Sequence, residues 1–559
     1  MGFHLRSRGL AGAATEPERS HRRPSRTWRV AGTMRGAGTM LGAGALAVAL
    51  AASATGAPAP AAAARTAAAA PRHGGSLTVL ESSGLAGSWP GLDPATDTGG
   101  AADSTYMDAI YGELFQLAPG GKTVGDLATG YRFTDGGRTV EITLRKGVTF
   151  SDGTPFDAAA VVFNWKRDLS GTCTCKPTFE QTQPPIIRRL GQYKVALTLT
   201  YVDAAFIDGL QGDIFNWIVS PRALRRMGER AFSLKPVGAG PFEVVSDIPS
   251  SQLVLKRNPH YWQKDRPYVS NLTFRTTPSD ESALEAMEAG SAQVYEDMST
   301  PQLVSAFKKR FLVTAEPSTS PYGVQLNTAA PPFNNIKARE AIYYATNALV
   351  LDVKLFGDAS PVGESFTAPA GLFYEQTVPG YRTYDLARAK ALVKQLGGLS
   401  VNLFAINIPT ALTLMEGLQT QWQAAGMTVT IHEYNLPSLI GQYQSKTWQA
   451  TLEAIGSLDP AAGIGLAFRY DSNSPFSGVH DPHLDALLAQ AAATINVPAR
   501  RRLYADAAAY IAKEAYSPFL FPLNSYDIAT PGVGGPGLSV PIPATVGAEI
   551  LWQDVYNNG

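Results

Sequence analysis

Residues 236–242, with the sequence Pro-Val-Gly-Ala-Gly-Pro-Phe, constrain the fold of this chain more than any other segment. Each proline fixes its own φ at about −65° and lacks a backbone N–H, so the segment can continue neither a helix nor the interior of a sheet. The two glycines allow backbone angles that are closed to other residues. The segment therefore predicts a rigid bend, mechanically an ordinary tight turn, that leads into a strand over residues 242–245.

The N-terminal part of the chain differs in composition from the rest. Arginines are frequent over residues 22–35, an apolar run follows over residues 40–50, and small residues then offer Ala-x-Ala choices such as residues 57–59. This order predicts an exported protein in which residues 1–73 are a signal peptide and an Ala/Pro-rich leader. A retained membrane anchor is the alternative, but the apolar run is shorter than the ~20 residues that a membrane span requires.

The two cysteines of the chain are Cys173 and Cys175, and neither follows the apolar run, so no lipid-attachment cysteine is expected. The two can pair in an oxidising compartment, although so small a ring is strained, and their pairing stays open. The chain has 47 basic and 47 acidic residues, so its net charge is zero and it lacks the excess of positive charge that is typical of nucleic-acid-binding proteins. Its 559 residues exceed what one hydrophobic core normally supports, so two lobes are expected.

Apolar periodicity, glycines and capping residues predict the regular elements that follow the leader. We expect strands over residues 76–80, 138–144, 242–245, 271–275, 322–327 and 520–523. We expect helices over residues 106–115, 158–165, 281–290, 337–345 and 386–393, with Asp157 and Asp385 as N-caps. A helix, a glycine and a strand over residues 422–429 favour a βαβ arrangement.

Three separated motifs occur in a fixed order, at residues 144–156, 236–242 and 257–262. Together they resemble the family 5 extracellular solute-binding proteins, which serve ABC importers for peptides, nickel and related solutes. The resemblance covers roughly residues 74–559, including a Leu-Asp-Pro turn at residues 92–94 and a residue like Tyr295 after a helix.

This resemblance implies an α/β, two-lobed periplasmic-binding-protein-like fold of class II, with an extra subdomain in the first lobe. We expect the first lobe over residues 74–322, the second lobe over residues 323–518, and a return to the first lobe over residues 519–559. The implied function is that of an exported substrate-binding component of an ABC importer. It would capture a peptide or peptide-like solute by hinge closure and deliver it to permease subunits, as a monomer, without cofactor, metal, nucleic acid or catalysis.

We expect candidate ligand-binding residues at strand ends and in the loops that face the hinge, with Tyr322 at the crossover between the lobes. They are Glu81, Ser82, Ser83, Trp217, Tyr322, Trp448, Asp459, Arg469 and Tyr470. Aromatic rings offer apolar platforms, and one or two charges would orient the solute. Each aromatic residue has the alternative role of a core residue, and Asp459 that of a turn or cap residue. For Glu81 and Arg469 the alternative is a solvated charge or a salt bridge.

One position departs from the peptide-binding members of the family. These often place an aspartate shortly before an Asp-Pro pair to hold the amino group of the peptide, whereas Gly456 stands at that position before Asp459 and Pro460. A peptide therefore remains the first expectation, with a sugar, an opine-like compound, a nickel chelate or a secondary metabolite as alternatives.

Other motifs do not support a different function. Residues 120–123 contain the Gly-Lys-Thr of a phosphate-binding loop, but Gln116 replaces its first glycine. Residues 480–483 include two histidines, yet Asp481 and Pro482 fit a helix start better than a metal site. A GxSxG motif is absent from the sequence, which disfavours the usual esterase. A secreted hydrolase on a two-lobed scaffold and a non-transport solute receptor remain the competing hypotheses.

Overall fold

The structure is a computed structural model of the chain. It describes residues 70–82, 91–97, 103–171, 184–211, 213–298, 300–357, 360–454, 459, 465–474, 476–543 and 549–559. The chain divides into two compact units, residues 1–68 and 69–559, and every described residue lies in the second unit. Residues 1–69 of the predicted signal peptide and leader lie outside the described residues, as do Cys173, Cys175 and Gly456. Within the described part, no helix combines the length and hydrophobicity needed to cross a membrane.

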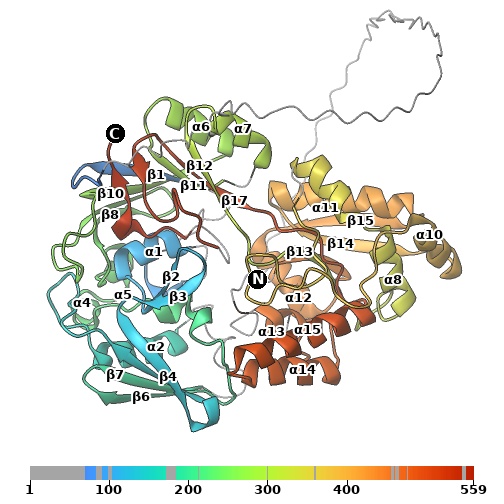
Figure 1. Cartoon of the computed structure of the whole chain (residues 1–559), viewed down its shortest axis with the longest axis horizontal. Helices are drawn as coiled ribbons and strands as arrows, with labels where there is room; N and C mark the ends of the chain where they lie inside the picture. Colours follow the sequence, from blue (N-terminus) through green and yellow to red (C-terminus); the bar gives the residue numbers. More distant parts are fainter. Residues whose placement is uncertain are drawn as a thin grey trace, which may run out of the picture. The chain divides into compact units, whose positions relative to one another are not determined.

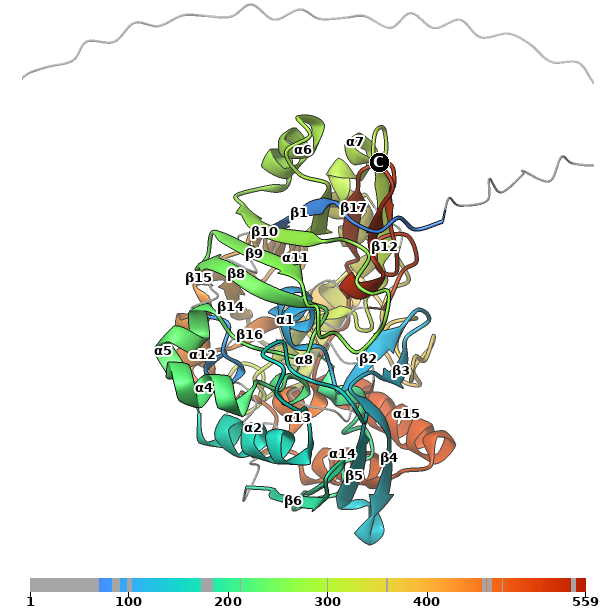
Figure 2. The same cartoon turned by 90° about the vertical axis from the view of Figure 1, so that its left-hand side faces the viewer.

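The first lobe is built on a seven-stranded mixed sheet (Figures 1 and 2). In spatial order its strands are β12 (Leu312–Glu316), β17 (Ser525–Ala529), β11 (Val294–Met298), β1 (Ser76–Ser82), β10 (Asn271–Thr277), β9 (Gln252–Arg257) and β8 (Phe242–Ile248). Strand β1 runs parallel to β10 and β11, and the other neighbouring pairs are antiparallel. The sheet therefore joins segments from both ends of the described part of the chain.

The side chains of β1 alternate between the two faces of this sheet, and apolar side chains point into a hydrophobic cluster on each face. Leu77 and Val79 point into the large core of the first lobe, whereas Leu80 points into a smaller cluster on the opposite face. Glu81 falls on the same face as Val79, at the carboxyl end of the strand, where it is buried. The helices packed in these two clusters include α1 (Ser104–Tyr111) and α6 (Asp280–Glu288).

An antiparallel subdomain extends the first lobe. Its four-stranded sheet has the order β4 (Ala128–Thr134), β5 (Thr139–Leu144), β7 (Lys194–Thr198) and β6 (Ile186–Gly191). A hairpin of β2 (Phe115–Ala118) and β3 (Lys122–Gly125) precedes it, and the Gly-Lys-Thr motif forms part of this hairpin. The remaining first-lobe helices are α2 (Ala158–Ser170), α4 (Pro221–Met227), α5 (Glu229–Leu234) and α7 (Val304–Phe307). Asp157 caps α2 as predicted, by accepting from the backbone N–H groups of Ala159 and Ala160.

The predicted helix over residues 106–115 is shorter than expected. It ends at Tyr111 because Gly112 adopts a φ of 64°, and Phe115 already begins β2. The strand after the Pro-Val-Gly-Ala-Gly-Pro-Phe segment is confirmed as β8. The reason given for its two glycines was wrong, because neither Gly238 nor Gly240 has a positive φ.

These two glycines are required by close contact with the end of α1. A Cβ on Gly238 would lie 2.2 Å from the carbonyl oxygen of Ile110, and one on Gly240 would lie 2.6 Å from the nitrogen of Gly112. Gly240 N–H also donates to the Ile110 carbonyl at 3.0 Å. The segment therefore packs its backbone directly against α1, which a side chain would prevent.

The second lobe contains a four-stranded sheet in the order β13, β16, β14 and β15. Its strands are β13 (Tyr322–Leu326), β16 (Ala450–Ala454), β14 (Ser400–Ile406) and β15 (Thr428–Tyr434). Its helices are α8 (Ile336–Ala345), α9 (Ala348–Leu351), α10 (Leu386–Gln395), α11 (Pro409–Ala424), α12 (Leu436–Ser445), α13 (Gly465–Tyr470), α14 (Pro482–Ala493) and α15 (Val497–Glu514). Asp385 caps α10 and Asp481 caps α14, both as predicted.

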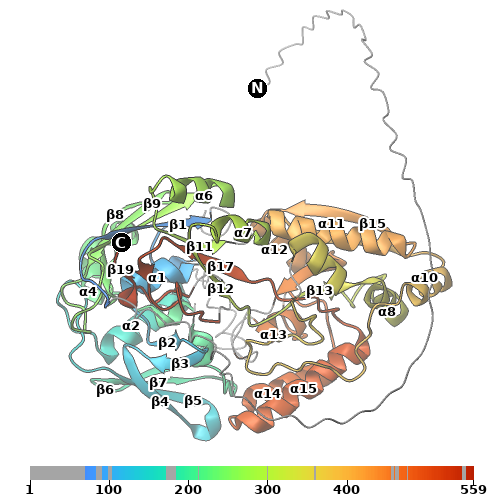
Figure 3. The ribbon, with the colours of Figure 1, turned by 45° about the horizontal axis from the view of Figure 1, so that its top comes forward.

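The predicted βαβ arrangement is confirmed, because β14 and β15 pair in parallel and α11 connects them (Figure 1). Figure 3 shows α11 beside β15. Leu403 of β14 packs in the core that includes α11, whereas Phe404 packs with Leu439 and Tyr443 of α12. The alternation of β14 thus places α11 and α12 on opposite faces of the sheet. A small C-terminal ladder of β18 (Val533–Gly534) and β19 (Tyr556–Asn557) completes the described strands.

The chain passes between the two sheets twice in the described structure. β12 belongs to the first sheet and β13 to the second, so the first passage falls within residues 317–321. β17 returns to the first sheet beside β12 (Figure 1). The prediction of a strand over residues 520–523 was wrong, because β17 begins only at Ser525. Before β17, the backbone of Leu520 and Phe521 forms hydrogen bonds with Tyr322 of β13. The exact lobe boundaries stay predictions.

Candidate functional site

The parallel strands of the two large sheets define the edges where a ligand is expected, since open α/β sheets bind ligands at the carboxyl ends of their strands. In the first lobe, β1 ends at Ser82 beside its parallel neighbours β10 and β11. In the second lobe, β14 lies between its parallel neighbours β15 and β16. The structure thus places Glu81 and Ser82 at the first of these edges, and Ser83 lies outside the described residues.

The two passages between the sheets meet at Tyr322. Its N–H donates to the carbonyl of Phe521 at 3.0 Å, and its own carbonyl accepts from the N–H of Leu520 at 2.7 Å. In the neighbouring part of the first sheet, Glu316 at the end of β12 stands opposite Ser525 at the start of β17. Tyr322 is half-buried and therefore remains a candidate ligand contact at the crossover.

Five acidic side chains gather where β1, β11, β12 and β17 run together. We call them the crossover carboxyl cluster: Glu81, Glu296, Asp297, Glu316 and Asp527. The carboxyl groups of Glu81 and Glu296 lie within hydrogen-bonding reach of each other, and so do those of Glu316 and Asp527. Electrostatic contact of Glu296 and Asp297 with Asp527 connects the two pairs into one cluster. The sequence analysis had proposed only Glu81 of these residues.

A β-bulge brings two of the acids to this place. The register between β11 and β17 shifts between Tyr295 and Met298, so Glu296 and Asp297 both lie in the irregular stretch. Asp297 has a φ of 55°, and its N–H points at the Asp527 carboxylate over 3.4 Å. Bulges commonly redirect side chains next to functional sites.

Burial dominates the electrostatics of the cluster. It raises the pKa of Glu81 and of Asp527 to about 8, and it holds the pKa values of Glu296 and Glu316 well above the usual range. Hydroxyl groups stabilise two of the carboxylates, since Thr105 donates to Glu296 at 2.7 Å and Ser525 donates to Glu316 at 2.9 Å. The neighbouring acids add repulsion, so the chain alone disfavours full ionisation here.

A second polar group lies at the end of β16. Glu453 is buried, and the hydroxyl of Tyr470 donates to its Oε1 at 2.9 Å. Burial raises the pKa of Glu453, while the nearby Arg469 acts in the opposite direction. Arg469 also donates to Oε1 of Gln325 at 3.2 Å, which ties α13 to β13. The structure therefore brings the predicted Arg469 and Tyr470 together around an acid that was not predicted.

A comparison of sequence profiles decides the family. Residues 122–474 match the profile described as "Bacterial extracellular solute-binding proteins, family 5 Middle". The chain belongs to this family. The two-lobed α/β fold, with two sheets and a chain that passes twice between them, agrees with that membership.

Relatives of this family 5 protein include the "Glutathione-binding protein GsiB" of Salmonella paratyphi A, which is 30% identical over 346 residues, 61% of this chain and 66% of the relative. The "Di/tripeptide-binding protein 1" of Pseudomonas aeruginosa is 26% identical over 79% of this chain and 88% of its own length. Among solved structures, the periplasmic binding protein DppA of Helicobacter pylori in complex with the peptide STSA superposes with a TM-score of 0.73 at 21% identity, covering 87% of this chain and 99% of DppA. The last comparison concerns the fold alone.

Trp448 and Trp217 lie in the interior of the family 5 protein. Trp448 is fully buried in the apolar cluster between α12 and β14. Trp217 is fully buried in the first lobe and donates its indole N–H to Asp108 at 2.6 Å. Neither residue lies on the carboxyl edge of a sheet, so the structure favours the core role for both.

Trp217 borders a separate group of acids. Asp108, Glu113 and Glu549 each offer a carboxylate oxygen within 4.8 Å of the others. Burial raises the pKa of all three, and Trp217 and Asn216 donate to Asp108 and Glu113. The chain therefore supplies donors of its own to this group, and we assign no metal to it.

Asp459 has a charged partner inside the second lobe. It is fully buried, and its Oδ2 forms a salt bridge of 2.8 Å with Nη2 of Arg500 in α15. The side chain of Arg500 is 4% exposed. Arg500 also donates to the carbonyl of Thr494 at 3.1 Å. This pair fits a structural role for Asp459 better than contact with a solute.

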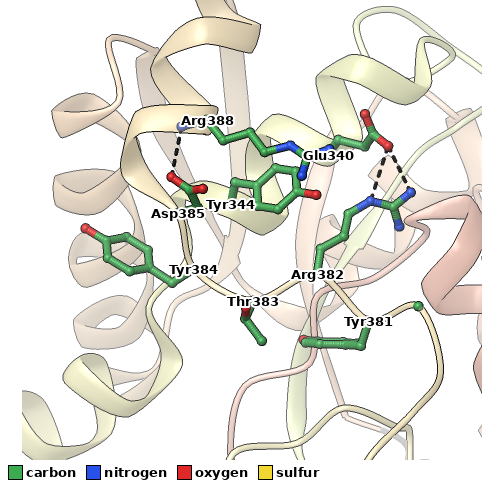
Figure 4. Close-up of a pocket in the computed structure, with 9 residues that line it drawn as sticks. Glu340, Tyr344, Tyr381, Arg382, Thr383, Tyr384, Asp385 and Arg388 are labelled. Atoms are coloured by element: carbon green, nitrogen blue, oxygen red, sulfur yellow. Dashed lines mark hydrogen bonds and ion pairs between the residues drawn. The ribbon is translucent and has the colours of Figure 1, made fainter.

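A groove of about 660 Å³ lies on the second lobe between α8 and the start of α10 (Figure 4). Arg382 donates to Oε1 of Glu340 from Nε at 3.2 Å and from Nη2 at 2.9 Å. The guanidinium of Arg388 lies 4.4 Å from the ring centre of Tyr344. Asp385 caps α10 by accepting from the backbone N–H of Arg388, so each of these charged side chains already has a partner within the chain, and we assign no ligand to the groove.

Proposed function

We propose that this family 5 protein captures a peptide or peptide-like solute between its two lobes. The observation that carries the proposal is the family match over residues 122–474 on a structure whose two sheets are joined by two crossing segments. Two connections of this kind suit a hinge, and a hinge allows ligand binding to select a closed form. The solute would then reach the permease subunits of an ABC importer from the closed protein.

The relatives support the solute class. They are named for binding glutathione and for binding di- and tripeptides, so we infer a short peptide or a peptide-like compound as the ligand. Glu81, Ser82, Ser83, Tyr322, Arg469 and Tyr470 remain the proposed contacts from the sequence. Gly456 offers no carboxylate for the amino group of a peptide, so that group needs another partner in this chain.

The remaining parts of the proposal concern how the protein works in the cell. We infer that it acts as an exported monomer behind a signal peptide within residues 1–73. We also infer that it returns the solute chemically unchanged, as the binding proteins of its family do. A hydrolase on this scaffold would instead convert the solute.

The test is a thermal shift assay on a chain that begins at Ala70, after unfolding and refolding to remove any co-purified solute. A ligand that binds only the native state stabilises it by about 2.7 kcal/mol at 100 times its Kd. We expect pools of di- and tripeptides to raise Tm, and sugar, opine and nickel-chelate pools to leave it unchanged. Mass spectrometry of the peptides afterwards should show no conversion. Cleaved peptides, or a shift only with another pool, would contradict the proposal.

A further inference from the structure

The antiparallel subdomain of the first lobe contacts the second lobe away from the two crossing segments. In the loop over residues 199–211, which follows β7, the N–H of Ala204 donates to the carbonyl of Ala492 at 2.8 Å. Ala492 lies in the last turn of α14. Figures 1 and 3 show α14 and α15 reaching toward the subdomain, on a side of the molecule away from β12 and β17. The two lobes are therefore joined at a third place, where the link is not covalent.

An apolar contact accompanies this hydrogen bond. Gly137 is buried in the turn between β4 and β5. A Cβ on Gly137 would lie 2.9 Å from Cγ1 of Val202 and 3.1 Å from Cδ1 of Ile495. Val202 belongs to the same loop as Ala204, and Ile495 belongs to the turn between α14 and α15. The turn of the second lobe thus fits closely against two segments of the subdomain.

A buried charge extends the contact. Arg500 of α15 acts electrostatically on Asp203 and Asp208 of the subdomain loop. It also acts on Tyr131 of β4, although its salt bridge is with Asp459 of its own lobe. Asp203 and Arg500 are both buried, and they come from different lobes. Separation of the lobes would therefore admit water to charged groups that this structure covers.

We propose that these contacts form an interlobe latch, made by Gly137, Val202 and Ala204 of the first lobe and Ala492 and Ile495 of the second, that holds the loaded protein closed and sets the rate at which the solute leaves. The inference rests on the proposed solute-binding function and adds the retention of the solute to it. A hinge at the two crossings lets the lobes move apart, whereas a contact on the other side must break before the cleft opens. The latch stabilises only the closed form, so it does not affect the encounter of the solute with the open form.

The test compares Ile495→Ser with Leu349→Ser on the refolded chain that begins at Ala70. Ile495 is 46% exposed and Leu349 is 50% exposed, so neither substitution should unfold the protein. Leu349 is the matched control, because it lies in α9, which packs on α11 within the second lobe. The probes are trialanine and reduced glutathione. Stopped-flow tryptophan fluorescence measures their association and dissociation rate constants.

We expect Ile495→Ser to raise the dissociation rate constant by about threefold to tenfold, because roughly half of the apolar surface of this side chain is covered in the closed form. The association rate constant should stay unchanged, because the solute enters the open form. Leu349→Ser should change neither value. An equal dissociation rate constant in the wild type and in Ile495→Ser would overturn the proposal.

Hydrogen exchange tests the latch without any solute. The described hydrogen bond of the Ala204 N–H crosses between the lobes, so this amide exchanges when the latch opens. We expect Ile495→Ser to speed its exchange by the same factor as dissociation, and Leu349→Ser to leave it unchanged. Mass spectrometry of a fragment that contains Ala204 measures the rate. If neither probe binds, the proposed function fails, and exchange alone still tests the contact. If a probe binds but exchange at Ala204 is the same in Ile495→Ser, the latch fails and the solute receptor stands.

Asp203 makes the latch sensitive to pH. Burial raises the pKa of Asp203 to about 7, against the hydrogen bond from the N–H of Ala205 and the charge of Arg500. Opening of the latch exposes this carboxyl group, which then titrates near about 4. The closed form therefore binds more protons between these values, so the latch is tightest at low pH and weakens as the pH rises to about 7, by up to about tenfold per pH unit. The other titratable groups that face Asp203 are Asp208, Asp459, Tyr201 and Tyr504.

Asp203→Asn isolates this effect, because the amide keeps an acceptor for the N–H of Ala205 and removes the charge. We expect the dissociation rate constant of the wild type to rise from pH 5 to pH 7, and Asp203→Asn to flatten that rise. A full rise in the variant would show that other groups cause it and would overturn the part of the proposal that concerns Asp203.

Discussion

Arg500 and Arg501 are sequence neighbours in α15 with opposite surroundings. Arg500 is 4% exposed and pairs with the fully buried Asp459, whereas Arg501 is 46% exposed and pairs with Glu375, which is 33% exposed. A buried ion pair is often no more stabilising than apolar residues of the same size, but the removal of one partner leaves an uncompensated charge. The two arginines therefore form a natural comparison between buried and exposed pairs.

Arg500→Ala should lower the free energy of unfolding by about 3–5 kcal/mol, because Asp459 then stays buried without its cation. Arg501→Ala should change it by about 0–1 kcal/mol, as expected for an exposed pair. Urea denaturation followed by tryptophan fluorescence measures both values. Equal effects of the two substitutions would show that Asp459 is solvated or compensated elsewhere.

Single residues also show why the site was only partly predictable. Glu81 was proposed because it follows an apolar strand, and the structure buries it at the end of β1. Asp527 and Glu453 were not proposed, although both are acids within short strands that otherwise favour apolar or β-branched residues. An acidic residue within a short, otherwise apolar strand was the sequence feature that could have indicated these site residues. The surroundings of Asp527 depend on the pairing of β17 with β11 and β12, and those of Glu453 on the pairing of β16 with β13, which sequence spacing does not reveal.

Among the structural elements, the bend before β8 shows which features local sequence predicts and which depend on tertiary contact. Its position and the strand that follows were predicted from two prolines and two glycines, and both are correct. The role of the glycines was not predicted, because it depends on the end of α1, more than 120 residues earlier in the chain. The local sequence therefore predicts the bend and the strand, whereas the contact with α1 explains why the bend contains glycines.

Gly240→Ala should destabilise the protein by about 1–3 kcal/mol, because its Cβ would lie 2.6 Å from the nitrogen of Gly112 and would separate the bend from α1. Gly130→Ala in β4 is the matched control, since a Cβ there meets no atom within 4 Å. We expect the control to be neutral or slightly stabilising, by roughly 0.5 kcal/mol. Thermal denaturation compares the two variants. A neutral Gly240→Ala would mean that α1 and the bend can move apart freely.

At the scale of the whole molecule, the order of motifs predicted the two-lobed fold well. The prediction succeeded because the strands, caps and turns of each lobe are encoded locally, as Asp157, Asp385 and Asp481 show. It failed where the two lobes meet. The sequence of residues 520–523 predicts an apolar strand. In the structure Leu520 and Phe521 form hydrogen bonds with the backbone of Tyr322, and β17 begins only at Ser525.

The buried acids of the first lobe give the free protein a characteristic dependence on pH. Burial raises the pKa of Glu81 and Asp527 to about 8 and that of Asp126 to about 6, whereas the unfolded chain titrates such groups near about 4. The folded protein thus binds more protons than the unfolded chain between these values. Each group contributes its full stability below about pH 4 and loses it progressively as the pH rises to its folded pKa, at up to about 1.4 kcal/mol per pH unit.

We therefore expect the Tm of the ligand-free protein to fall between pH 5 and pH 8, as measured by scanning calorimetry. Asp527→Asn should flatten this decline because it removes one of the titrating groups. Glu141→Gln should leave it unchanged, because Glu141 lies in β5 and is paired with Arg132 and Lys194. A free protein whose Tm rises over this range would show that these acids are already ionised and compensated within the chain.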